Sequence, residues 1–139
     1  MEILKIEKLR KIYHTKKREI LAVDNFSFNL EKGQFIAIVG PSGCGKSTIL
    51  KMLCDLEKKS SGNIIFENVT LGYMPQGDSL FEWRSVLKNC LLGLEINNVL
   101  TKENTDYVKK LLKIYGLKDF MNVYPNNLSG GMRQRVLWI

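Results

Sequence analysis

Two segments near the start of the chain alternate apolar and polar residues. They span residues 3–13 and 20–30. A period of two residues is typical of strands that bury one face, and it favours antiparallel pairing. The polar stretch between them, residues 14–19, carries a basic run at 16–18. We interpret this run as a solvated hairpin turn rather than as a polyanion site.

Residues 35–39 follow a different pattern, because all five are apolar (Phe-Ile-Ala-Ile-Val). A short unbroken apolar run bounded by turns predicts a strand that is buried on both faces, as in a parallel sheet. Beyond the glycine-rich residues 40–45, apolar side chains recur at helical spacing: Ile49, Met52, Leu53 and Leu56. This spacing predicts an amphipathic helix. Two further short strands are expected over residues 64–67 and 71–73.

The pattern becomes helical from Trp83 onward and is clearest over residues 101–116. Thr101 is a candidate N-cap, and Gly116 is a candidate residue just past the C-terminus of the helix. The apolar stripe between them consists of Val108, Leu111, Leu112 and Tyr115. A β-rich front followed by a helical segment predicts an α/β protein.

Size and composition narrow the class of protein. The chain has 139 residues, of which 45% are hydrophobic and 25% charged, which is typical of one globular domain. The net charge of +7 is spread along the chain without interleaved aromatic residues, so we expect no nucleic-acid partner. Three cysteines and one histidine are too few for a structural zinc site, and no apolar stretch approaches the length of a membrane span. We expect reduced thiols in the cytoplasm.

Residues 40–47 read Gly-Pro-Ser-Gly-Cys-Gly-Lys-Ser and match the phosphate-binding pattern G-x-x-x-x-G-K-[ST]. Glycines let the backbone wrap a phosphate, and the following helix directs its positive end to the same place. We expect Lys46 to neutralise the β- and γ-phosphates and Ser47 to ligate Mg²⁺. For Cys44 we expect a structural role. The alternative, a glycine-rich turn that binds nothing, is disfavoured by the strand and helix predicted on either side.

A second motif lies at residues 128–135, which read Leu-Ser-Gly-Gly-Met-Arg-Gln-Arg. Ser129 is a good N-cap, and Gly130 and Gly131 permit close backbone approach to an anion at a helix N-terminus. Simple helix capping would explain these residues but not the phosphate loop upstream. The stretch resembles the signature motif of ATP-binding cassette (ABC) ATPases, with Met132 where glutamine is commonest.

The resemblance covers the whole chain and implies roles for further residues. Tyr13 would stack on adenine, with a core residue at a strand end as the alternative. Gln76 would contact Mg²⁺ and the attacking water, and it would act in catalysis together with Lys46. The implied ATP site consists of Tyr13, Gly40, Pro41, Ser42, Gly43, Cys44, Gly45, Lys46, Ser47 and Thr48. Ser47 and Gln76 would ligate the metal. Ser129, Gly130 and Gly131 would contact the ATP that is bound to a second copy of the chain.

The same resemblance implies the architecture and the partners. The fold would be that of an ABC-type P-loop NTPase, with residues 1–76 as the ATP-binding core part, containing an antiparallel β subdomain and the P-loop strand and helix. Residues 77–130 would form the helical subdomain and 129–139 the start of the signature helix. The pair Trp83–Arg84 is similar to ATPases of bacterial nitrate, sulfonate, taurine and pyrimidine-precursor importers. Such ATPases form head-to-tail homodimers on membrane permease subunits at the cytoplasmic face, and they serve a solute-binding protein indirectly.

In the family, the signature helix leads to a Walker B aspartate, a catalytic glutamate and a switch histidine, none of which occurs among these residues. His14 lies too early to be the switch histidine. We therefore expect a C-terminally truncated form with an incomplete core, arising from a frameshift, a premature stop or a clipped gene boundary; a genuine short protein is the less favoured alternative. For the 139-residue chain we expect weak or no ATP binding and negligible hydrolysis. The alternatives are a non-catalytic remnant and, disfavoured by the signature motif, an unrelated P-loop kinase or small NTPase.

Overall fold

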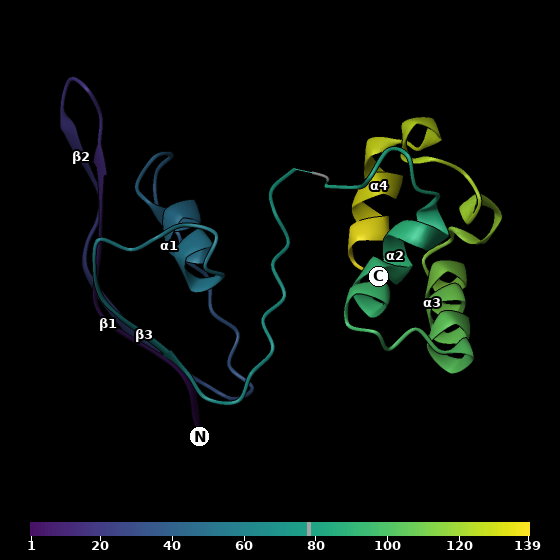
Figure 1. Ribbon diagram of the computed structural model, residues 1–139, viewed down its shortest axis with the longest axis horizontal. Coiled ribbons are helices and arrows are strands. Elements are labelled where there is room, and N and C mark those ends of the chain that lie inside the picture. Colours follow the sequence, from purple (N-terminus) through teal and green to yellow (C-terminus); the bar gives the residue numbers. More distant parts are fainter. Residues whose placement is uncertain (78) are drawn as a thin grey trace. The chain divides into compact units, whose positions relative to one another are not determined.

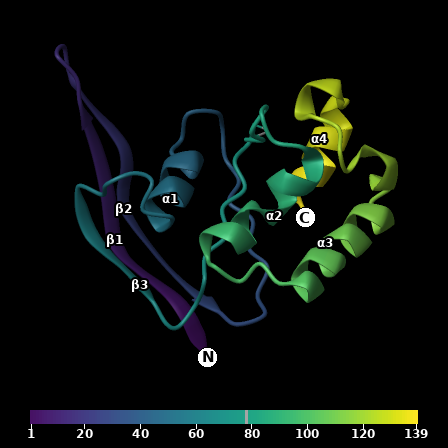
Figure 2. The same cartoon turned by 45° about the vertical axis from the view of Figure 1, so that its right-hand side comes forward.

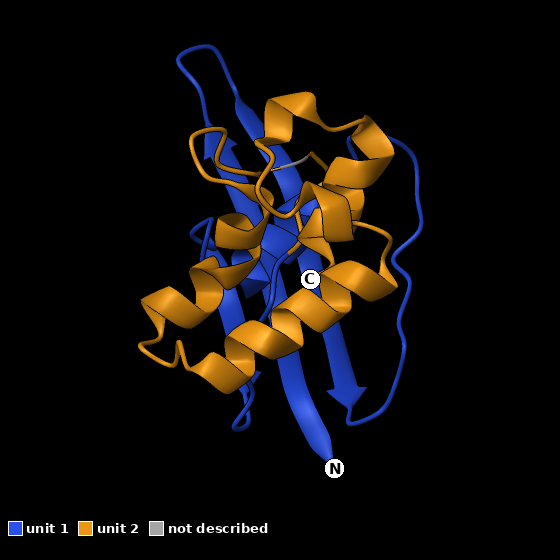
Figure 3. Ribbon diagram, turned by 90° about the vertical axis from the view of Figure 1, so that its right-hand side faces the viewer, with its two compact units in different colours: residues 1–73 blue, residues 74–139 orange. Residues whose placement is uncertain are grey.

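The computed structural model describes residues 1–77 and 79–139, so Asp78, inside the predicted range 77–130, lies outside the described residues. The chain divides into two compact units, residues 1–73 and 74–139 (Figure 3). The predicted boundary at residue 76 lies within three residues of this division.

The first unit is built on a three-stranded antiparallel sheet with strand order β2-β1-β3 (Figure 1). Its strands are β1 (Glu2–His14), β2 (Glu19–Glu31) and β3 (Ser61–Phe66). The predicted strands at 3–13, 20–30 and 64–67 are therefore confirmed, with the basic run in the exposed turn between the first two. Thr15 closes this turn, because its amide donates to the Arg18 carbonyl at 3.0 Å.

A bulge in β1 changes which residues face the core. Lys8 has a left-handed backbone with φ of 48°, and its amide donates to Ser27 Oγ at 2.9 Å. Before the bulge the buried residues are Leu4 and Ile6, and after it they are Leu9 and Lys11. The bulge shifts the alternation by one residue, so both pairs lie on one face of the sheet.

Helix α1 (Lys46–Leu53) covers this face, and Figure 2 shows it lying along the hairpin. Its Ile49 and Met52 pack with Val23 and with the buried apolar residues of β1 as one hydrophobic core: Leu4, Ile6 and Leu9. The predicted amphipathic helix is confirmed, although Leu56 lies beyond its end and is exposed. The chain leaves the helix through Asp55, which has a φ of 54°.

The prediction of a buried strand at residues 35–39 is wrong for this structure. These residues form no strand, and Phe35 and Val39 are 94% and 87% exposed. A strand of a parallel sheet needs neighbours for its backbone groups and for both of its faces. Within the described residues no strand pairs with this segment. The expected strand at 71–73 is likewise absent, for the same reason.

The second unit is helical. It contains α2 (Val86–Ile96), α3 (Lys102–Ile114) and α4 (Gly130–Leu137), with the 3₁₀ turns η1 (Lys118–Phe120) and η2 (Pro125–Asn127). Its core is formed by seven buried residues: Val86, Leu91, Val108, Leu112, Leu117, Leu128 and Val136. The predicted helix over 101–116 is confirmed at both ends. Thr101 Oγ1 accepts from the Asn104 amide at 3.1 Å, and Gly116 has a φ of 71°.

Among the helices of residues 1–77 and 79–139, none combines the length and the apolar character that crossing a bilayer requires.

Candidate functional site

The phosphate-loop sequence leads directly into helix α1. Gly45 is the N-cap residue, with φ of 96° and ψ of 0°, and its carbonyl accepts from the Ile49 amide at 2.9 Å. Because the N-cap is a glycine, no side-chain oxygen of that residue occupies the amides of the first turn. Those amides and the helix dipole therefore point at the loop as an anion-binding end.

Two glycines are required by close approach. A Cβ on Gly45 would lie 2.3 Å from the Ala22 carbonyl oxygen of β2, and a Cβ on Gly40 would lie 2.8 Å from Cys44 Sγ. Any side chain at residue 45 would therefore push the start of α1 away from the sheet. The contact at Gly45 is with backbone and cannot be relieved by a side-chain rotation, whereas the contact at Gly40 is with the Cys44 side chain.

Lys46 directs its charge into the loop. Its Nζ donates to the Gly40 carbonyl at 2.8 Å and to the Pro41 carbonyl at 2.6 Å, and it lies 3.5 Å from Cys44 Sγ. These contacts hold a cation at the centre of the backbone curve formed by residues 40–45. A cation in that position suits a phosphate group.

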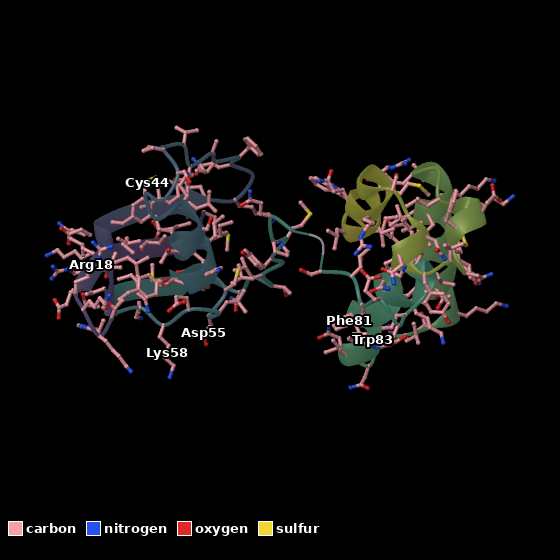
Figure 4. All side chains as sticks on the ribbon, turned by 90° about the horizontal axis from the view of Figure 1, so that it is seen from above. Arg18, Cys44, Asp55, Lys58, Phe81 and Trp83 are labelled. Atoms are coloured by element: carbon pink, nitrogen blue, oxygen red, sulfur yellow. The ribbon has the colours of Figure 1, made fainter. Side chains whose placement is uncertain are left out.

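The remaining loop residues lie around this cation. Ser42, Gly43, Cys44 and Ser47 are exposed, and Thr48 is half-buried in the first turn of α1. Figure 4 shows Cys44 on the loop, well away from Arg18 at the hairpin tip. Together these residues offer a lysine, a set of amides and three hydroxyls, which is a donor set that fits a triphosphate with its Mg²⁺.

Tyr13 lies near the same end of the hairpin. It pairs with Ile20 on β2, while Ala22, two residues further along that strand, contacts the start of α1. Tyr13 and the start of α1 therefore both lie beside residues 20–22 of β2. The Lys11 Nζ lies over the Tyr13 ring at 4.6 Å from its centroid.

The signature residues lie at the start of α4 in the second unit. Ser129 is the N-cap, and its Oγ accepts from the Met132 amide at 3.4 Å. Gly130 and Gly131 are exposed, and a Cβ on either would meet nothing within 4 Å. The predicted capping is confirmed, whereas no packing among the described residues of the chain requires a glycine at either position.

Gln76 is exposed and belongs to the second unit. It lines a cavity of about 330 Å³ together with Pro75 and three residues of the signature helix and its end: Gln134, Leu137 and Trp138. The structure therefore groups Gln76 with the signature segment. Its predicted role at the metal stays a prediction.

The Trp83–Arg84 pair has two environments. Trp83 is 74% exposed and packs edge-on against Phe81, with ring centroids 4.9 Å apart (Figure 4). Arg84 turns inward, where its Nη2 donates to both Glu95 carboxylate oxygens at 2.7 and 2.8 Å. The Arg84 side chain is thus bound to Glu95 of α2, while Trp83 lies at the surface.

Sequence reasoning missed two ion pairs beside these motifs. Lys11 Nζ lies 2.6 Å from Glu57 Oε1, and Arg133 Nη2 lies 2.5 Å from Glu82 Oε1. The only sequence signal for the first is that Lys11 follows Leu9 at strand spacing, on the face that the core residues share. For the second pair the sequence carries no local signal.

Comparisons with known proteins agree with the motifs. The family described as ABC transporter matches residues 23–138. An uncharacterized ABC transporter ATP-binding protein of Bacillus subtilis is 41% identical over 97% of this chain and 55% of its own length. A nitrate import ATP-binding protein of Synechocystis is 36% identical over 96% of this chain and 53% of its own length. A dimeric ATP-binding cassette bound to ADP and Pi superposes with a TM-score of 0.86 at 29% identity, over 97% of this chain and 67% of that one. The chain spans about half the length of these curated relatives.

Proposed function

Because the chain belongs to the ABC transporter family of ATP-binding proteins, we propose that its phosphate loop binds ATP with Mg²⁺. The observation that carries this proposal is the position of Lys46, whose ammonium sits among the backbone carbonyls of the loop at the positive end of α1. A cation and a helix N-terminus that converge on one glycine-rich loop form an anion site of the phosphate-binding type.

The proposal assigns a contact with the nucleotide or its metal to residues of the loop and to Gln76 and Tyr13. Lys46 exchanges its carbonyl contacts for the β- and γ-phosphate oxygens, and the amides of residues 43–48 donate to the same groups. The Ser47 hydroxyl would hold Mg²⁺, which would supply charge neutralisation at the phosphates, and the family resemblance gives the Gln76 amide oxygen a role toward the same ion. Tyr13 stacks on the adenine ring.

Head-to-tail pairing of two copies gives the signature residues their role. Gly130 and Gly131 are exposed, and no described residue of their own unit lies within 4 Å of the place where a Cβ would be. Such open glycines at a helix N-terminus suit the close approach of a phosphate held by another copy. In the proposed dimer, Ser129 and these glycines contact the γ-phosphate held by Lys46 of the second copy.

At the level of the whole protein, we propose the ATP-binding subunit of a bacterial importer, which couples ATP binding and hydrolysis to solute uptake. It would be peripheral on the cytoplasmic face of the membrane, attached to permease subunits and served indirectly by a solute-binding protein. The named functions of the relatives support this assignment, nitrate import among them.

A second candidate for the 139-residue polypeptide is nucleotide binding without hydrolysis. The exposed segment at residues 35–39 favours it, because the strand that should enter the phosphate loop is not paired. A loop that is anchored only through α1 holds phosphates less rigidly than one built into a sheet, and phosphoryl transfer depends on rigid positioning.

An amide NMR titration with Mg-ATP tests the binding proposal on the 139-residue chain. We expect weak binding, with shifts confined to Tyr13, Gln76 and residues 40–48. Lys46→Ala should abolish these shifts, whereas Lys51→Ala, which removes an exposed lysine from the same helix, should not. Equal shifts in the Lys46→Ala variant, or none in the parent chain, would contradict the proposal.

A further inference from the structure

Lys11 is the one charged residue of the described chain that is buried, with an exposure of 8%. It follows the bulge at Lys8 and lies in the row that Leu9 begins on the core face of β1. Burying a lysine is unfavourable unless its charge is paired, so its partners have to account for its position.

Those partners come from the segment after α1. Lys11 Nζ donates to Glu57 Oε1 and to the Lys58 carbonyl oxygen, both at 2.6 Å. The two bonds fix the end of a long, otherwise flexible side chain. With its position fixed in this way, the ammonium lies over the ring of Tyr13, 4.6 Å from the centroid.

Tyr13 is two residues beyond Lys11 on the same strand, so both side chains project from one face of the sheet. A cation on one face of an aromatic ring is attracted by the electron density of that ring. The contact occupies one of the two ring faces, and Glu57, the carboxylate partner of Lys11, also interacts with the side chain of Tyr13.

We propose that Lys11 is a positioning residue for base recognition: by holding one face of Tyr13, it presents the other face to the purine ring of the bound nucleotide. This proposal rests on the proposed function of the phosphate loop. Lys11 does not contact the nucleotide in this scheme. It raises the fraction of chains in which the Tyr13 ring is already in the stacking orientation, and apparent affinity scales with that fraction.

Two ligands separate this role from a merely structural one. Mg-ATP uses both the phosphate loop and Tyr13, whereas inorganic tripolyphosphate with Mg²⁺ uses the loop alone. For Lys11→Met, which keeps the apolar stem, we expect about tenfold weaker ATP binding, as for the loss of a desolvated cation–π contact. Tripolyphosphate binding should be unchanged.

Lys5→Met is the matched control. Lys5 lies on the same strand and pairs with Glu7 at 2.7 Å, but its side chain is 42% exposed and makes no cation–π contact in the described structure. This variant should bind both ligands as the parent chain does. In a Tyr13→Ala background, Lys11→Met should cause no further loss of ATP affinity, because the lysine then has no ring to position.

A measurement without nucleotide tests the contact itself. In the NMR spectrum of the 139-residue chain, we expect cross-peaks between the Lys11 ε-methylene and the Tyr13 ring protons. Their absence would overturn the proposal, as would an equal loss of ATP and tripolyphosphate binding in Lys11→Met or an unchanged ATP affinity. If the parent chain bound neither ligand, the proposed function would fail and this proposal with it. If the parent chain binds tripolyphosphate but Lys11→Met does not weaken ATP binding selectively, this proposal is overturned while the proposed function of the phosphate loop stands.

Discussion

Glu82 and Arg133, 51 residues apart in the sequence, form an ion pair of 2.5 Å that ties the segment after Gln76 to the signature helix. Arg133 also donates through Nη1 to the Pro125 carbonyl at 3.1 Å, just before the signature residues. One guanidinium therefore connects three parts of the second unit. The Glu82 Oε2 atom is buried and accepts no hydrogen bond within the described structure.

Removing this carboxylate should destabilise the second unit. For Glu82→Ala we expect a loss of about 1 kcal/mol in the free energy of unfolding, limited by the partial exposure of Glu82. Urea denaturation followed by circular dichroism measures it. Asp106→Asn, which breaks the exposed pair between Asp106 and Lys109, should change stability by less than about 0.5 kcal/mol. Equal effects of the two variants would show that the Glu82–Arg133 pair contributes no more to the free energy of unfolding than an exposed ion pair does.

The start of α1 should not tolerate a side chain at residue 45. Gly45→Ala combines a left-handed backbone with a Cβ 2.3 Å from the Ala22 carbonyl, so we expect a cost of about 2–4 kcal/mol. Gly43 has a φ of 81° but open space around it, so Gly43→Ala should cost only about 1–2 kcal/mol. Thermal unfolding of the two variants compares them directly. A larger loss at residue 43 would contradict the packing seen here.

Alanine at Gly131 should stabilise the chain. The residue lies in α4, has no positive φ and has nothing within 4 Å of the place where a methyl group would lie. The expected effect is therefore only the higher helix propensity of alanine compared with glycine. We expect a gain of up to about 1 kcal/mol in the unfolding free energy, measured by urea denaturation. A loss instead would mean that the glycine is required by its own unit rather than by a ligand or a second copy.

The thiol of Cys90 should make stability fall at high pH. Burial raises the pKa of this thiol from 9.0 to about 11. The unfolded chain therefore loses the proton first, and between pH 9 and pH 11 the folded state is destabilised by up to about 1.4 kcal/mol per pH unit. Unfolding of Cys90→Ala across this window should lack that part of the pH dependence. An identical pH profile in the variant would contradict the burial of the thiol.

Local sequence patterns were sufficient to predict most of the helices and strands. The strands of the sheet, helix α1 and the caps at Thr101 and Ser129 depend on neighbours within a few positions, and all of them are found. The segment at 35–39 could not be predicted in the same way, because its state depends on pairing partners and not on its own composition. Its apolar run describes what the segment would bury if neighbours were present.

The candidate site shows the same limit. The phosphate loop and the signature motif are contiguous, so their spacing reveals them. Lys11 is different, since lysine is expected at the surface and only the bulge at Lys8 turns it toward the core. The pair of Glu82 and Arg133 joins distant residues with no periodic relation, so only the folded structure brings it to light.

The unpaired segment at residues 35–39 also bears on how ligand binding and order are linked. The phosphate loop is attached to packed structure through α1 but not through the residues that precede it. A ligand that binds the loop must therefore order the backbone of the preceding segment, at a conformational-entropy cost of about 1–2 kcal/mol per ordered residue. Binding would then be weakened by this entropy and would show an unfavourable entropy change in calorimetry. Any partner strand that ordered these residues beforehand would enhance nucleotide affinity without touching the nucleotide.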